Sequence, residues 1–167
     1  SISTFSAAKA GCQAEIGASS AMAAAGLSAM RGMSPERCIN AAAIALKNML
    51  GLACDPIAGL VEVPCVKRNA IGVVHAMTAS DMSLAGVTSV IPFDEVVMAM
   101  NDVAKNMNEN IRETSRGGLA VTPTGKRIMQ EMLEKKRQRT QSPVVPQQVW
   151  GDEVRTVAEQ EKESIGL

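Results

Sequence analysis

Two cysteines stand eleven positions apart in the stretch CDPIAGLVEVPC, and each has a proline within two positions. They are Cys54 and Cys65, and the prolines and a glycine between them predict an irregular backbone. Cys12, in AGCQAEIG, stands just before a predicted helix. Thiolates in such places can accept hydrogen bonds from free backbone N–H groups, as the ligands of iron–sulfur clusters do. Cys38 differs, because it falls inside a predicted helix, where a free cysteine commonly packs as a small hydrophobic residue.

The spacing of these cysteines does not by itself define a metal site. The pattern C-x41-C-x10-C matches neither the C-x2-C pairs of zinc sites nor the cysteine runs of ferredoxins. From the residues alone, metal binding and ordinary core thiols remain equally open. Nothing at the start of the chain resembles a secretory signal, so the four cysteines are expected to be thiols or metal ligands rather than disulfides. The expected compartment is the cytoplasm.

Helices rich in small residues must position these thiols. The chain is 46% hydrophobic but has two Phe, one Trp and no Tyr, so Ala, Val, Ile, Leu and 11 Met must build its core. Apolar spacing predicts helices over 13–31, 34–50, 67–85, one that begins near 92–94 and one that resumes near 124. Ser34 is the predicted N-cap of the second helix, with Pro35 at its first position. The predicted fold is all-α: a compact bundle of small-residue-rich helices with irregular cysteine-bearing loops.

Charge and hydropathy exclude several classes of function. The 17 Lys and Arg residues balance 17 Asp and Glu residues, so no nucleic-acid or membrane partner is expected. No apolar run reaches the roughly 18 residues of a membrane span. From Lys135 the chain becomes charged and contains Gln and Pro instead of core residues. We therefore expect one domain over 1–134 and a tail or linker over 135–167, with a short helix around 151–163.

Three long strings are more specific than the spacing. GCQAEIGASSAMAAAGL, CDPIAGLVEVPCVKRNAIG and RETSRGGLAVTPTG closely resemble the catalytic alpha chain of iron–sulfur-dependent L-serine dehydratase (L-serine ammonia-lyase). The resemblance runs in order over about 6–126. It implies that Cys12, Cys54 and Cys65 hold a [4Fe–4S] cluster, while Cys38 lies outside the motifs. Three ligands for four irons leave one iron with an open position, where it can act as a Lewis acid.

The resemblance also implies the chemistry, which converts L-serine to pyruvate and ammonia without pyridoxal phosphate. Serine would bind the open iron through its hydroxyl and carboxylate oxygens, and the general base would come from the beta domain or beta chain. The catalytic base is therefore expected outside this chain. His75, the only histidine, lies in a predicted apolar helix, where a structural role is the expected one.

Other residues of these motifs could contact substrate or cluster. Arg68 and Asn69 follow the second cysteine of the pair and could reach a substrate carboxylate or a cluster sulfide; the alternative is a solvated first helical turn. Asp55 could cap the cysteine loop or form a hydrogen bond near the cluster. In the SRGGLA loop, backbone N–H groups could face an anion, although a plain turn is equally consistent with the glycines. The candidates of this loop are Ser115, Gly117 and Gly118.

The chain is expected to be incomplete by itself. Full-length alpha chains of this family carry a further segment, with an Asn/Gly-rich substrate-binding loop, before the position of Ser1. We therefore expect domain 1–134 to lack its N-terminal part, the isolated chain to be inactive or nearly so, and a partner chain or oligomer to cover apolar helix faces. Two alternatives stay open: a related lyase acting on another β-substituted amino acid such as cysteine, and a non-catalytic helical interaction module whose thiols pack or hold zinc.

Overall fold

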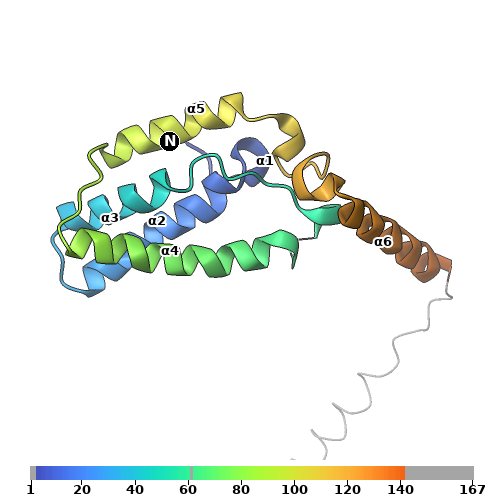
Figure 1. Cartoon of the computed structure of the whole chain (residues 1–167), viewed down its shortest axis with the longest axis horizontal. Coiled ribbons are helices and arrows are strands. Elements are labelled where there is room, and N and C mark those ends of the chain that lie inside the picture. Colours follow the sequence, from blue (N-terminus) through green and yellow to red (C-terminus); the bar gives the residue numbers. More distant parts are fainter. Residues whose placement is uncertain (1–2, 61, 142–167) are drawn as a thin grey trace, which may run out of the picture. The chain divides into compact units, whose positions relative to one another are not determined.

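The computed structural model of the chain describes residues 3–60 and 62–141 (Figure 1). These residues form helices and helical turns, and no β-strand occurs among them, which confirms the predicted all-α class. The elements follow in the order α1 Ala7–Ala10, η1 Gln13–Gly17, α2 Ala18–Met30, α3 Pro35–Lys47, η2 Ile57–Gly59, η3 Glu62–Val66, α4 Lys67–Leu84, α5 Phe93–Asn106, η4 Glu109–Ile111, η5 Gly118–Val121 and α6 Pro123–Gln141.

The chain divides into two compact units, residues 1–132 and 133–167. All residues discussed below as site or core residues belong to the first unit. Of the second unit the structure describes residues 133–141, which are helical. The short helix expected around 151–163 lies outside the described residues. A cluster-binding role for 1–134 and a tail or linker role for 135–167 stay predictions.

Local sequence accounts for the ends of α3. The Ser34 hydroxyl accepts a hydrogen bond from the backbone N–H of Arg37, and Pro35 occupies the first turn, as the sequence predicts. Lys47 stands in the last turn, where a cation interacts favourably with the helix dipole. The helix ends there, slightly before the predicted end, because residues 48–51 form a turn whose Gly51 has φ +85°.

Helices α2, α3, α4 and α5 pack side by side through small residues (Figure 1). The core they share contains mostly alanine: Ala10, Ala14, Ala21, Ala24, Ala41, Ala42, Ala43, Ala45, Ala76, Ala79 and Ala104, with Ile44, Leu46, Val96 and Met100. Gly72 of α4 lies so close to α2 that a Cβ there would come within 2.9 Å of Ser20 Oγ. Ser20 Oγ donates to the carbonyl of Gly72 at 3.1 Å. Close helix approach therefore depends on the small side chains.

His75 belongs to this packing. Its Nε2 lies 2.9 Å from the carbonyl oxygen of Ala45, so the ring links α4 to α3. This contact agrees with the structural role expected for the histidine. Within the described residues, no helix is both long and apolar enough to span a bilayer.

Candidate functional site

The backbone before α2 brings Cys12 into the interior. Gly11 has φ +72°, and a Cβ at this position would come within 2.8 Å of the Leu52 carbonyl and 2.7 Å of the Met107 sulfur. Only glycine combines this conformation with this close approach. Cys12 itself is fully buried. Glycine is therefore required where the chain turns to place this thiol.

The five residues after Cys12 form a π turn, whereas the sequence predicts ordinary α-helix from residue 13. Gln13 is the reason, because its partners lie elsewhere in the fold. Its backbone N–H donates to the Leu52 carbonyl, its Nε2 donates to the Met100 carbonyl at 3.1 Å, and its Oε1 accepts from Gly51 N–H at 2.9 Å. Such π turns often occur at functional sites. Gln13 thus fixes the backbone next to a candidate ligand, a role that sequence analysis misses.

Cys54 and Cys65 lie near Cys12. Burial raises the pKa of the Cys54 thiol well above its ordinary value, and the neighbouring Cys12, Glu113 and Cys65 raise it further. Burial and then Cys12 likewise raise the pKa of Cys65. Cys12 and Cys54 also share one buried cluster of side chains. The fold therefore gathers the three predicted ligands, and the thiols of Cys54 and Cys65 hold their protons more tightly than an exposed cysteine does.

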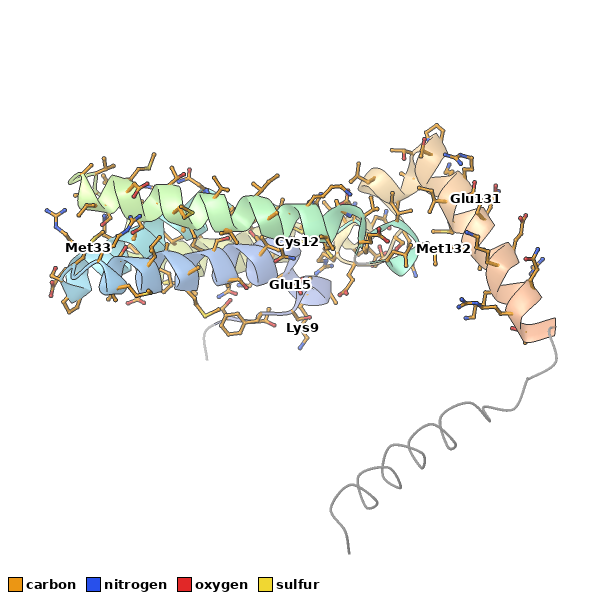
Figure 2. All side chains as sticks on the ribbon, turned by 90° about the horizontal axis from the view of Figure 1, so that it is seen from below. Lys9, Cys12, Glu15, Met33, Glu131 and Met132 are labelled. Carbon is orange, nitrogen blue, oxygen red and sulfur yellow. The ribbon has the colours of Figure 1, made fainter. Side chains whose placement is uncertain are left out.

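Cys38 lies elsewhere. It is half-buried in α3, and its thiol is 3.7 Å from the carbonyl oxygen of Met33. Figure 2 shows Met33 at the opposite end of the helical bundle from Cys12, Glu15 and Lys9. The fourth cysteine is thus separated from the other three.

The motif RETSRGG packs directly against the cysteine loop. Cys54 N–H donates to the Ile111 carbonyl, and Glu113 N–H donates to the Cys54 carbonyl, both at 2.8 Å. These two bonds make an isolated parallel bridge between Cys54 and Arg112. Further along, Ser115 Oγ donates to the Pro56 carbonyl at 2.7 Å. Ser115 therefore holds two loops together, and its contact with substrate or cluster stays a prediction.

Asp55 and Arg68 form a buried ion pair behind the thiols. Asp55 Oδ2 accepts from Leu119 N–H at 2.8 Å. Its Oδ1, which has no aligned hydrogen bond among the described residues, lies 2.9 Å from Arg68 Nη1. The same Nη1 donates to the Ala53 carbonyl at 2.8 Å and lies 4.0 Å from Cys12 Sγ. Arg68 is thus not a solvated side chain, and Asp55 both caps a backbone N–H and orients Arg68.

A cavity of about 560 Å³ opens beside two of the thiols. It is lined by Ala8, Glu15, Cys54, Pro56, Gly59, Cys65, Asn69, Arg112, Glu113 and Thr114. Asn69 is the predicted contact residue that lies here, and its Nδ2 donates to the Cys65 carbonyl at 3.0 Å. Arg112 and Glu113 are not singled out by sequence analysis. The signal that could have found them is their position at the start of RETSRGG, a motif that carries the family resemblance.

The donor set fits a cluster better than a single ion. Among the described residues, no three His, Cys, Asp or Glu side chains are arranged to hold one metal ion. A structural zinc ion needs such convergence, since its Zn–S bonds are about 2.3 Å long. A cluster binds each thiolate through a different iron, so its ligands stand farther apart. Three soft thiolates, two of them beside a cavity, are donors of the kind that an iron–sulfur cluster takes.

The glycines of the SRGG loop are explained by packing. Gly118 has φ +59°, and a Cβ there would overlap the carboxylate of Asp55; a Cβ on Gly117 would come within 2.9 Å of the Asn110 carbonyl. Both glycines permit the loop to approach neighbouring chain segments. In the same loop, Leu119 N–H donates a hydrogen bond to the Asp55 carboxylate. The anionic group that contacts this loop is therefore a side chain of the protein.

Gly118→Ala is therefore expected to destabilise the domain more than Gly59→Ala. Gly59 also has a positive φ, +72°, but a Cβ there would meet open space. The control substitution costs only backbone strain, about 1 kcal/mol. Gly118→Ala also forces Asp55 to move, so its total loss in the free energy of unfolding should be about 2 to 4 kcal/mol. Urea unfolding of both variants measures the difference, and equal losses would contradict the close packing of Gly118 on Asp55.

Fold and site together define a helical domain that gathers three thiols, two of which border a cavity lined by charged residues. Residues 1–120 match the family model described as serine dehydratase alpha chain. The chain therefore belongs to the serine dehydratase alpha chain family, which confirms the resemblance seen in the motifs.

Individual relatives agree with this assignment. The probable L-serine dehydratase alpha chain of Bacillus subtilis is 58% identical over 130 residues, which cover 78% of this chain and 43% of the relative. The L-serine dehydratase alpha chain of Peptoniphilus asaccharolyticus is 53% identical over 131 residues, 78% of this chain and 45% of the relative. L-serine dehydratase 1 of Escherichia coli is 47% identical over 119 residues, which cover 71% of this chain and 26% of the relative. The chain spans less than half the length of these relatives.

Proposed function

We propose that this chain supplies the cluster site of a cytoplasmic [4Fe–4S]-dependent L-serine dehydratase that converts L-serine to pyruvate and ammonia. Family membership supports serine deamination, since relatives are named for it. One observation carries the cluster assignment: Cys12, Cys54 and Cys65 come together from three segments, while Cys38 does not.

Each residue near the thiols has a role in this proposal. Cys12, Cys54 and Cys65 would hold the cluster, which would supply a Lewis-acidic iron for the departing hydroxyl oxygen. Arg68, 4.0 Å from Cys12 Sγ, would orient that thiolate by a charge-assisted contact. Asn69 would hold the backbone at Cys65. The burial of Cys12 and Cys54 would exclude water from one side of the site.

The general base would come from a beta chain or beta domain. The sole histidine of this chain is engaged with the Ala45 carbonyl between two helices. Apolar side chains on α4 support contact with another chain or domain, because Ile71, Val73, Val74 and Met77 are each about half exposed or more. Such a patch is typical of an interaction surface. The active enzyme would therefore be an assembly in which this chain provides the cluster half.

Anaerobic reconstitution with iron and sulfide tests the proposal. We expect about four irons per chain and broad visible absorption. Adding L-serine to the assembled enzyme should change the visible and electron paramagnetic resonance spectra, because the substrate would bind at an iron. Colourless protein that takes up zinc or no metal would contradict the cluster. A cluster whose spectra respond to L-cysteine but not to L-serine would contradict the substrate.

A further inference from the structure

Arg112 is the basic residue among those that line the described cavity beside Cys54 and Cys65. Its place is set by the backbone. The parallel bridge pairs it with Cys54 through hydrogen bonds on both sides of the pair. Paired residues in a bridge direct their side chains to the same side, and both Cys54 and Arg112 reach the cavity. The backbone of Arg112 is thus held next to a proposed cluster ligand by main-chain bonds, and the residue lines the cavity.

The guanidinium of Arg112 has unused donors. Nη1 donates to the Lys9 carbonyl at 3.3 Å, and Nε is buried without a hydrogen-bond partner among the described residues. An arginine carries five N–H donors, and the contact with Lys9 uses only part of this capacity. Arg68 differs, since its Nη1 already contacts Ala53, Asp55 and Cys12. Of the two arginines near the thiols, Arg112 is the one that lines the cavity.

The cavity presents charges of both signs. Besides Arg112 it is lined by Glu15 and Glu113, so residues of both charge signs border the same space. This combination suits a zwitterion, with its carboxylate on the guanidinium and its ammonium near a carboxylate. Glu113 also has φ +65°, a left-handed conformation that is strained for this residue type and often marks functional sites.

We infer that Arg112 binds the α-carboxylate of the amino-acid substrate, an inference that rests on the proposed function. The class of ligand is then a small α-amino acid with a free carboxylate. The sequence alone offers Arg68 and Asn69 as candidates for contact with a substrate carboxylate or a cluster sulfide. Arg68 makes internal contacts and is not part of the cavity lining, whereas Arg112 borders the cavity, which favours Arg112 over Arg68 for this role.

The test uses the reconstituted, assembled enzyme and two ligands, L-serine and L-serinamide, which lacks the carboxylate. Spectral titration gives the dissociation constant of each ligand, and steady-state kinetics give KM and kcat for L-serine. In the wild type, L-serinamide should bind much more weakly than L-serine. Arg112→Gln should weaken L-serine about tenfold to a hundredfold, in line with loss of a charge-assisted bond, and leave L-serinamide nearly unchanged. KM should rise more than kcat falls.

Two further variants control the experiment. Arg112→Lys keeps the charge but loses the planar fork, so its L-serine affinity should lie between those of the wild type and Arg112→Gln. Arg116→Gln removes an arginine of the same motif whose side chain is 69% exposed, and it should bind both ligands as the wild type does. Iron content and the spectrum without ligand should match the wild type in all three variants, because Arg112 is assigned to substrate and not to the cluster.

Several outcomes would overturn the inference. Equal losses of affinity for L-serine and L-serinamide in Arg112→Gln would show that the residue does not recognise the carboxylate. Loss of iron in Arg112→Gln and Arg112→Lys would place it in cluster binding instead. If the wild-type enzyme responds to L-serine and Arg112→Gln binds L-serine with the same affinity, this inference alone is wrong and the proposed function stands. A wild type with neither iron nor a serine response would remove the proposed function and this inference together.

Discussion

Cys12→Ala, Cys54→Ala and Cys65→Ala are each expected to abolish a stable cluster, whereas Cys38→Ala keeps it. Each of the first three removes one of the thiolates that would hold the cluster. Cys38 lies in α3 with its thiol against the Met33 carbonyl, at the other end of the bundle from Cys12 (Figure 2). Iron and sulfide per chain and the visible spectrum after anaerobic reconstitution measure the outcome. We expect near-complete loss in the three variants and wild-type values in the fourth.

The Cys38 variant is the matched control because it removes a thiol without touching the site. Circular dichroism of the metal-free proteins separates loss of the cluster from loss of the fold. A folded Cys65→Ala protein that retains full iron and sulfide would remove Cys65 from the ligand set. Loss of the chromophore in Cys38→Ala would show that the gathering of the other three thiols does not define the ligands.

Arg68→Met is expected to destabilise the domain by about 3 kcal/mol. The substitution removes the cation from a buried carboxylate, and breaking one side of a buried ion pair typically costs 3 to 5 kcal/mol. The lower end applies because the Arg68 side chain is 21% exposed, against 7% for Asp55. Urea unfolding of the metal-free protein measures the loss. Adding Asp55→Asn should recover part of it, since no buried charge is then left uncompensated.

An exposed ion pair provides the comparison. Arg127 and Glu131 lie one helical turn apart in α6, 2.8 Å from each other, with both side chains at least half exposed. Arg127→Met should cost about 0.5 kcal/mol or less, as exposed pairs do. Equal losses for Arg68→Met and Arg127→Met would indicate that the Asp55–Arg68 pair does not hold the cysteine loop against α4. Strict additivity of the Asp55 and Arg68 substitutions would contradict their direct coupling.

Local signals were sufficient for the helices. The Ser34–Pro35 pair begins α3 and Pro92 precedes α5, because capping and proline geometry act within one helical turn. The abundance of alanine and the scarcity of aromatic residues predict close helix packing, and the alanine-rich core confirms it. The π turn after Cys12 could not be predicted, because it depends on what Gln13 meets in segments 38 and 87 positions away.

The candidate ligands could be identified in the sequence because the motif strings indicate the family and contain three of the four cysteines. The residues that contact these ligands could not be identified in the same way. Asp55 meets Leu119 across 64 positions, and Cys54 pairs with Arg112 across a similar interval. No local propensity encodes such pairings, since they form only when the helices bring loops together. The sequence by itself thus determined the helices and the thiols, whereas tertiary packing decided that Arg68 supports the site and Arg112 borders its cavity.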